Sequence, residues 1–205
     1  MKNPNHDKIY PVHRYHGQVG AMSESCLKLR RRLFAWEIDE FRPVFGSSLN
    51  YHIVWIHECT PWPDWADRLG RRLKRMPPPG EREHNAVTLG NHCYFPVSLP
   101  MQLPPVGDRE SYKLDWLVHE LTHAWQYQKL GWKYLWLAIR AQLKERELAY
   151  DFGGESGLVN SRQKSIQFRK FNPEQQGNIV QSYYVRKRAN LDVSAWEPFI
   201  DDVRA

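Results

Sequence analysis

Hydrophobic residues recur along the chain at two spacings, one typical of helices and one typical of strands. From Ser23 onward, apolar residues follow one another at mostly helical intervals, which predicts a helix that Pro43 ends. Segment 51–59 alternates apolar and polar residues and contains β-branched and aromatic side chains, as a strand would. Segment 61–76 has the pattern of a short helix with proline at its start and a proline-rich stop.

A strand-like segment and an irregular one precede the longest helical pattern of the chain. Residues 85–95 place β-branched and aromatic residues around Gly90, which predicts a strand with a bulge or a close backbone approach at the glycine. The proline-rich run 96–108 fits no regular element and is expected to cross the surface. A long, largely apolar helix then begins at Asp108 or Ser111 and ends at a glycine.

The last third of the chain is predicted to be mainly helical. One helix covers 133–152, and the glycine-rich run 153–157 interrupts the chain after it. Asn172 as N-cap and Pro173 at the first helical position start another helix, and 194–205 forms a short closing helix. Few, short strands among longer helices predict an α+β fold that is mostly helical with a small sheet.

Length and composition predict one compact unit. The chain has 205 residues, of which 41% are apolar and 13% aromatic, enough for a single sizeable core. Residues 1–20 lack periodicity and are expected to form a flexible leader, with 21–205 as one domain. Because the sequence shows neither a membrane-spanning apolar run nor the apolar middle of a signal peptide, we expect synthesis in the cytoplasm, and export only by another route.

The charge and the cysteine content of the chain exclude few classes of function. The formal charge of +6 gathers in the runs 27–33, 68–75 and 184–189, at spacings that solvated helix faces explain. An anionic partner such as nucleic acid is the alternative, but no nucleic-acid-binding motif accompanies the charge. Three cysteines without CxxC spacing predict neither a disulfide framework nor a thiolate zinc site, and leave a single bridge between Cys26 and Cys59 open.

The long helix carries two histidines four residues apart, with a glutamate directly after the first. His119 and His123 therefore lie one turn apart on one face and can reach one metal ion. Glu120 is turned by about 100° from His119 and can lie beside a metal-bound water without being a ligand. This is the HExxH arrangement of zinc hydrolases, with the glutamate as general base. Since three polar residues are costly on an apolar helix, we predict a Zn²⁺ site rather than a chance pattern.

A catalytic zinc site needs a third protein ligand, and the sequence offers several. The metzincin extension is excluded because Gln126 and Lys129 stand where it requires glycine and histidine. Glu174 opens an otherwise uncharged helical turn and is favoured, with attraction to the helix dipole as its structural explanation. Cys93 is the rival, since peptide deformylases combine HExxH with an upstream cysteine. Glutamates explained better by a charged helix face or a loop are Glu145, Glu147 and Glu155.

Residues that would assist the chemistry are sought on the helix of the predicted third ligand. Tyr183 and Tyr184, two to three turns beyond Glu174, are candidate catalytic residues that would stabilise the charge on an attacked carbonyl, although such tyrosines also serve packing. Asn178, one turn after Glu174, could orient a ligand histidine. The edge of strand 85–95 could hold an extended peptide by main-chain hydrogen bonds. Aromatic residues that could line specificity pockets are Trp125, Tyr127 and Trp132.

Three stretches, 86–95, 117–128 and 172–184, together resemble a family of bacterial metallopeptidase domains. Its members include the C-terminal toxin domains of type VI secretion spike proteins of the valine-glycine repeat type. In that family a TLGN-like strand precedes the HExxH helix, Trp and Gln follow the second histidine, and a glutamate in an EQQ-like element completes the zinc site. The resemblance covers roughly residues 30–187, while Ser182 stands where relatives carry an acidic residue.

The resemblance implies a zincin-like peptidase of the gluzincin type with His119, His123 and Glu174 as zinc ligands and Glu120 as general base. It also implies a peptide or protein substrate, and an antibacterial or host-directed effector that a dedicated system secretes into the periplasm or cytosol of a target cell. An immunity protein or a spike component would be its partner. Two other functions stay open, a non-catalytic basic binding module stabilised by metal and a zinc amidase or deformylase.

Overall fold

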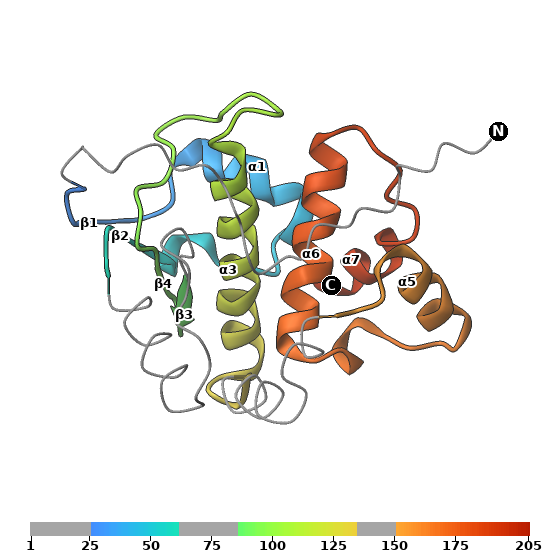
Figure 1. Cartoon of the computed structure of the whole chain (residues 1–205). Helices are drawn as coiled ribbons and strands as arrows, with labels where there is room; N and C mark the ends of the chain where they lie inside the picture. Colours follow the sequence, from blue (N-terminus) through green and yellow to red (C-terminus); the bar gives the residue numbers. More distant parts are fainter. Residues whose placement is uncertain (1–25, 62–85, 135–150) are drawn as a thin grey trace, which may run out of the picture.

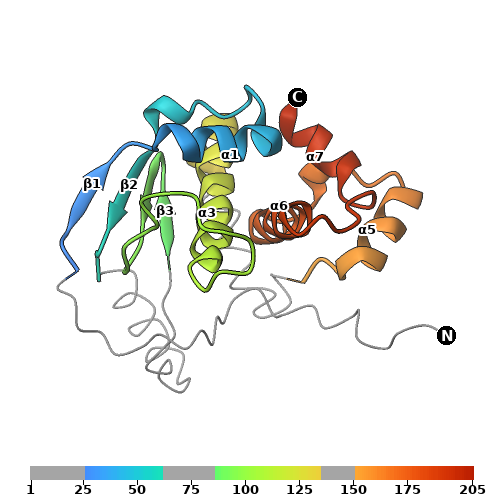
Figure 2. The same ribbon diagram turned by 90° about the horizontal axis from the view of Figure 1, so that it is seen from above.

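The computed structural model describes residues 26–61, 86–134 and 151–205. Within these ranges the chain forms five α-helices and a four-stranded mixed sheet, so the predicted α+β class is confirmed (Figure 1, Figure 2). The strands are β1 (Leu29–Arg31), β2 (Trp55–Glu58), β3 (Val87–Leu89) and β4 (His92–Tyr94). The helices are α1 (Ala35–Phe45), α3 (Ser111–Leu130), α5 (Gly154–Gln163), α6 (Pro173–Arg188) and α7 (Glu197–Arg204), with 3₁₀ turns η1 (Tyr51–Ile53) and η3 (Phe168–Lys170).

Several predictions concern segments outside the described residues. They are the leader 1–20, nearly all of the helices predicted for 61–76 and 133–152, the basic run 68–75 and the two glutamates Glu145 and Glu147. The irregular run 96–108 and helices α3, α6 and α7 are confirmed at the expected places. No helix of the described residues is both long and apolar enough to cross a membrane.

The sheet has the order β1-β2-β4-β3, with β2 parallel to β4 and the other two pairs antiparallel. The single strand predicted for 85–95 is wrong, because β3 and β4 form a hairpin that turns at Gly90 and Asn91. Gly90 has a φ of +65°, a conformation that glycine adopts without steric cost, and the turn takes the place of the expected bulge. In the described sheet, β3 is an edge strand and β4 lies next to it in the interior.

The helix predicted from Ser23 is wrong in its first half. Residues Leu29–Arg31 form β1, which pairs with β2, and α1 begins only at Ala35. The pairing buries Arg31 against two carboxylates that lie on other elements, an arrangement that a continuous helix would not provide. Tertiary contacts thus override the helical spacing of the apolar residues.

The prediction that Pro43 ends α1 is also wrong. The helix continues for two more residues to Phe45 and is followed by the C-cap Gly46, whose φ is +57°. In segment 51–59, only the second half is a strand, because Asn50 caps a 3₁₀ turn through its side chain. The glycine run 153–157 is likewise not a break, since α5 starts at Gly154.

Helix α3 stands between the sheet and α6 and is covered on both sides (Figure 1, Figure 2). Its side toward the sheet meets β3 and β4, including the fully buried Cys93, and its other side meets α6. The polar residues His119, Glu120 and His123 in the middle of α3 are therefore buried. Core residues contributed by α3 and α6 are Leu114, Leu117, Val118, Leu121, Ala124, Ile179, Val180, Tyr183 and Tyr184.

A disulfide joins Cys26 and Cys59, the bridge that the sequence left open. It connects the residues just before β1 with the end of β2, across a sequence separation of 33. Cys93 is a free, buried cysteine of β4. The bridge and the β1–β2 pairing therefore hold the same two segments together.

Arg31 links β1 to β2 and α1 through buried ion pairs. Its Nε lies 2.7 Å from Glu58 Oε1, and its Nη1 and Nη2 lie 2.7 and 2.9 Å from the two carboxylate oxygens of Glu37. Glu37 also accepts a hydrogen bond from the backbone N–H of Phe34 at the start of α1. Because the Glu37 and Glu58 side chains are at most 3% exposed, both carboxylates depend on this guanidinium.

Replacing Arg31 by alanine is expected to lower the free energy of unfolding by about 3–5 kcal/mol, because two buried carboxylates lose their counter-ion. Chemical denaturation measures this difference. Arg30→Ala on the same strand is the control, since Arg30 is exposed and packs on Trp55, and its loss should cost less than about 1 kcal/mol. Equal effects of the two substitutions would contradict the assigned role of Arg31.

Candidate metal centre

Two helix segments bring the candidate ligands together. His119 and His123 lie in the middle of α3, one turn apart and buried. Glu174 lies in the first turn of α6, which Asn172 caps by accepting a hydrogen bond from the Gln175 N–H at 2.9 Å. The capping box fixes where α6 starts and thereby where the Glu174 carboxylate stands. The three residues predicted as metal ligands do meet in the structure.

The distances among the three side chains suit a single metal ion. His119 Nε2 lies 3.1 Å from His123 Nε2, and these atoms lie 3.5 and 3.6 Å from Glu174 Oε2. Ligand atoms at the usual zinc distances of 2.0–2.1 Å in a tetrahedron are about 3.3 Å apart. Within the described part of the chain, this is the one group of His, Cys, Asp and Glu that could hold a metal. The donor set and the spacing both fit zinc.

Burial makes the charges of the triad depend on one another. Burial alone would lower the pKa of His123, but the Glu174 carboxylate beside it raises that pKa to about 9. Burial also disfavours ionised Glu174, yet His123 and His119 hold the pKa of this carboxyl well below its ordinary value. Without a metal, His123 and Glu174 therefore form a buried ion pair.

His119 lies directly against the backbone of α6 at Gly177. A Cβ atom on this glycine would lie 2.6 Å from His119 Cε1 and 2.9 Å from both ring nitrogens. Real side chains do not approach so closely, so only glycine leaves room for the ring. The first turns of α6 thus supply both the carboxylate of Glu174 and the space for the His119 imidazole.

The second ring nitrogen of His123, Nδ1, is hydrogen-bonded to a glutamine. His123 Nδ1 lies 2.9 Å from Gln126 Oε1, and Gln126 Nε2 donates to Gln176 Oε1 on α6 at 2.9 Å. Both glutamines are buried. Metal-binding histidines commonly donate their second ring N–H to an acceptor of this kind. The sequence offered no role for either glutamine, although both lie in the blocks that carry the family resemblance.

Glu120 points from α3 toward the sheet, whereas His119 and His123 point toward α6. Its carboxylate Oε2 accepts a hydrogen bond of 2.6 Å from the hydroxyl of Thr88, in the middle of the edge strand β3. Both residues are buried. Thr88 was missed by sequence reasoning, although the threonine belongs to the TLGN stretch that resembles the family. The contact fixes a carboxylate beside the triad.

Tyr134 packs on the triad and was also missed. Its ring stacks on that of His123 with centroids 6.4 Å apart, and its hydroxyl donates to the backbone oxygen of Thr88 at 2.8 Å. Burial raises the pKa of this tyrosine, so the hydroxyl stays protonated and remains a donor. Tyr134 therefore connects the histidine side of α3 with the strand that holds Glu120.

The two predicted catalytic tyrosines do not join the triad. Tyr183 donates its hydroxyl to Glu197 of α7 at 2.7 Å, and Tyr184 donates to Glu40 of α1 at 2.9 Å. Both rings belong to the core. Their structural explanation, packing of α6, accounts for them fully, and the structure does not bring either hydroxyl to the candidate metal site.

The other residues predicted as ligands or as walls of a specificity pocket have contacts away from the triad or no tested role. Cys93 lies outside the triad, with its thiol 3.8 Å from the backbone oxygen of Glu120, and burial raises its pKa. Asn178 is buried on α6, and its orienting role stays a prediction. Trp125 contacts Ser48, in the loop after α1, and Phe168 of η3. The ring of Trp132 contacts that of Tyr127 beside the β3–β4 turn.

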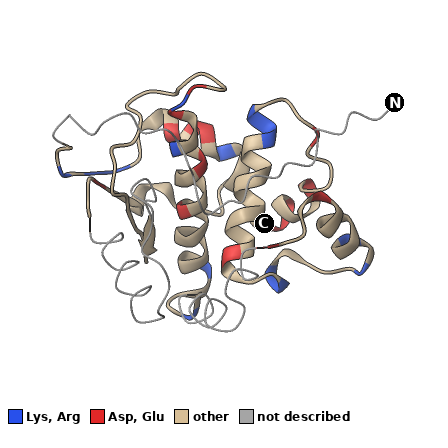
Figure 3. Ribbon diagram, viewed as in Figure 1, with Lys and Arg blue, Asp and Glu red and all other residues tan. Residues whose placement is uncertain are grey.

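Two arginines of the basic run 184–189 pair with carboxylates of the same chain. Figure 3 colours the basic and acidic residues along the ribbon. Arg186 Nη2 lies 3.5 Å from Glu155 Oε2, which removes this glutamate from the ligand candidates. Arg188 Nε lies 3.3 Å from Glu40 Oε1. In the run 27–33, the guanidinium groups that stack on Trp55 or pair with buried carboxylates are those of Arg30, Arg31 and Arg32.

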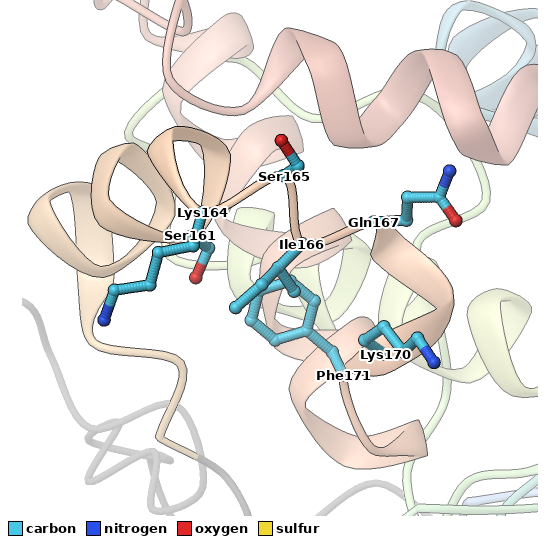
Figure 4. A pocket seen from close by; sticks show the side chains of 7 residues that line it. All are labelled: Ser161, Lys164, Ser165, Ile166, Gln167, Lys170 and Phe171. Carbon is cyan, nitrogen blue, oxygen red and sulfur yellow. The ribbon is translucent and has the colours of Figure 1, made fainter.

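A surface hollow between the end of α5 and η3 is separate from the triad (Figure 4). Ile166 and Phe171 lie at its centre, and the amines of Lys164 and Lys170 point away from it. None of its lining residues is a candidate metal ligand. The remaining lining residues are Ser161, Ser165 and Gln167.

Comparisons of the chain with protein families, with curated proteins and with solved structures found no match. The geometry of the residues themselves therefore carries the functional argument. The buried ion pair of the metal-free protein and the contact between His119 and Gly177 each lead to a testable expectation.

The buried pair His123–Glu174 predicts a pH dependence of stability in chelator-treated protein. A histidine pKa raised from 6.5 to about 9 adds stability that is complete below pH 6.5 and lost as the pH rises through 9. The lowered pKa of Glu174 adds stability above pH 4.5 that is lost as the pH falls through its folded value. Between pH 6.5 and 9 we expect a loss on the order of 3 kcal/mol.

Urea denaturation at a series of pH values measures this loss. Glu174→Gln is the control, because it removes the charge that raises the pKa of His123, and its stability should not fall over the same interval. A wild-type protein whose stability stays constant from pH 6.5 to 9 would contradict the assigned pair.

Gly177→Ala should separate metal binding from folding. Alanine normally stabilises a helix interior by about 0.5–1 kcal/mol relative to glycine, but here its methyl group would displace the His119 imidazole. We expect Zn²⁺ affinity to fall at least about tenfold, with little loss of thermal stability. Ser182→Ala, five residues further along α6, is the control and should leave Zn²⁺ affinity unchanged. A Gly177→Ala variant with normal affinity would argue against the close contact.

Proposed function

We propose that the chain is a zinc-dependent peptide-bond hydrolase of the gluzincin type, with α3 as the HExxH helix of a zincin-like fold. The observation that carries the proposal is the convergence of His119, His123 and Glu174, with a Glu120 carboxylate that bonds Thr88 and is near enough to contribute to the raised pKa of His123. Two histidines and one glutamate leave a fourth tetrahedral position for water or substrate, as in catalytic rather than structural zinc sites.

Zinc in such a site supplies a Lewis acid for the carbonyl and lowers the pKa of bound water to about 7. The residues of the chain supply the other parts of the reaction. Glu120 accepts the proton of the attacking water and returns it to the leaving amine. The hydroxyl of Thr88 keeps that carboxylate in place, and the burial of both groups strengthens their interaction with developing charge.

Substrate would bind along the strand that carries Thr88. β3 lies at one edge of the described sheet and packs against α3, next to Glu120. An extended peptide can add to such an edge through main-chain hydrogen bonds, which are largely independent of side chains. The exposed tenth of the His123 and Glu174 side chains marks the side from which water and peptide reach the triad.

The alternatives have less support. A deformylase-like site would need the Cys93 thiolate, but this thiol lies outside the triad and its pKa is raised by burial. A basic binding module would need free cations, yet the described arginines of the run 184–189 contact carboxylates of the same chain. The triad with Glu120 favours an enzyme.

The biological role is proposed on the resemblance alone. In the three blocks that resemble toxin domains of secretion spike proteins, the zinc ligands and the general base are all present. We propose a secreted antibacterial or host-directed effector, delivered into the periplasm or cytosol of a target cell and restrained in the producing cell by an immunity protein. The Cys26–Cys59 disulfide agrees with action in an oxidising compartment.

The central test compares metal content and peptide hydrolysis in the wild type and three variants. About one zinc per chain is expected in the wild type and in Glu120→Ala, and none in His123→Ala or Glu174→Ala. Glu120→Ala should lose about 10²–10⁴-fold in hydrolysis of a protein substrate such as casein, because it lacks the proton acceptor. Elemental analysis and a fluorescent casein assay measure the two quantities.

Glu155→Ala is the matched control, since this glutamate pairs with Arg186 and should keep both zinc and activity. A zinc-loaded, folded Glu120→Ala that hydrolyses at the wild-type rate would refute the proposed role of the glutamate. Zinc retained in Glu174→Ala would refute the proposed third ligand.

A further inference from the structure

The side chains of Gln126 and Gln176 form a continuous chain of hydrogen bonds that starts at His123 and ends at two backbone carbonyls. Gln126 Oε1 lies 2.9 Å from His123 Nδ1, and Gln126 Nε2 donates to Gln176 Oε1 at 2.9 Å. Gln176 Nε2 donates to the backbone oxygens of Phe168 at 3.2 Å and Phe171 at 2.9 Å. We call these two glutamines the amide relay.

The direction of every bond in the amide relay is fixed from its far end. Carbonyl oxygens only accept hydrogen bonds, so the group that Gln176 turns to Phe168 and Phe171 must be its NH₂. Its oxygen then faces Gln126 and requires a donor there. The backbone oxygen of Pro173 lies 3.0 Å from Gln126 Nε2 and also requires a donor at that position of Gln126. Gln126 is left with its oxygen toward His123.

An oxygen in that position can only accept, so the proton of the neutral His123 ring must be on Nδ1. We propose that the amide relay fixes this tautomer of His123 and makes Gln126 and Gln176 positioning residues of the metal site. The inference rests on the proposed zinc function. It assigns the lone pair to Nε2, the ring nitrogen that faces His119 Nε2 at 3.1 Å and Glu174 Oε2 at 3.6 Å.

The amide relay also explains why glutamine serves here instead of a carboxylate. Glu120 and Glu174 already place two carboxylates around the buried histidines. A third buried negative charge would require a further counter-ion, whereas an amide orients the ring without charge. Because Gln176 follows Glu174 by two residues, one turn of α6 both supplies a ligand and orients the ring of another.

The test measures the Zn²⁺ affinity of the full chain by competition with a chromophoric chelator. Gln126→Met and Gln176→Met are each expected to weaken binding about 10- to 100-fold, the usual effect of losing a partner of a ligand histidine. Gln128→Met on α3 is the matched control, because its amide bonds Asn50 and Asn91 and should leave the affinity unchanged. In the double variant, the effect should not exceed that of Gln126→Met alone.

A purely structural role predicts a different pattern. It would lower the stability of the chelator-treated variants, leave Zn²⁺ affinity unchanged after loading, and make the two substitutions additive. That result would overturn the amide relay. If Gln176→Met does not fold, Gln126→Met and its control still decide between the two patterns.

A spectroscopic readout tests the tautomer directly. In a long-range ¹H–¹⁵N spectrum of zinc-loaded protein labelled at histidine, the His123 ring is expected to show a protonated Nδ1 whose proton exchanges slowly with solvent. Gln126→Met should speed up this exchange and shift the Nδ1 resonance, because the proton loses its acceptor. A proton on Nε2, or an Nδ1 proton with the same exchange rate and shift in Gln126→Met, would overturn the inference. A wild-type chain that binds no Zn²⁺ would overturn the proposed function as well, whereas unchanged affinity in Gln126→Met overturns the relay alone.

Discussion

The contact between α3 and α6 is the constraint on which the candidate site depends. Both histidines of the triad belong to α3, and the carboxylate belongs to the first turn of α6. Because Gly177 lacks a side chain, the two helices come close enough for His119 to touch the backbone of α6. The start of α6 is set in turn by the capping box of Asn172. The ligand geometry is thus a result of how one helix begins and how closely it packs.

Electrostatics make the same contact a costly one. Burying a histidine or a carboxylate is unfavourable for each group alone, and the shifted pKa values of His123 and Glu174 show how strongly each stabilises the charge of the other. A fold that needed only a stable core could fill this space with apolar side chains at less cost. The presence of two imidazoles and a carboxylate there is therefore an argument for function, because the three groups together can ligate one metal ion.

The sequence predicted the parts of this site that depend on local spacing. His119, His123 and the N-cap before Glu174 follow from helix periodicity and capping, both properties of a few neighbouring residues. Thr88, Gln176 and Tyr134 could not be predicted in the same way, because each acts across the gap between two elements. The errors have the same origin. β1 replaced a predicted helix because Arg31 finds its carboxylates on other elements. The hydroxyls of Tyr183 and Tyr184 also find their partners across such gaps, on α7 and α1.

The residues of the HExxH pattern face two different neighbours of α3. His119 and His123 face α6, whereas Glu120 faces the sheet, where Thr88 holds it. In the proposed enzyme, metal binding therefore depends on one interface of the helix and the position of the general base on the other. Changes on the α6 side would act first on metal affinity, and changes on β3 would act on the rate while the metal remains bound. A binding module without catalysis would have no use for the second interface, since a buried carboxylate held beside the ligands contributes nothing to binding a partner elsewhere on the surface.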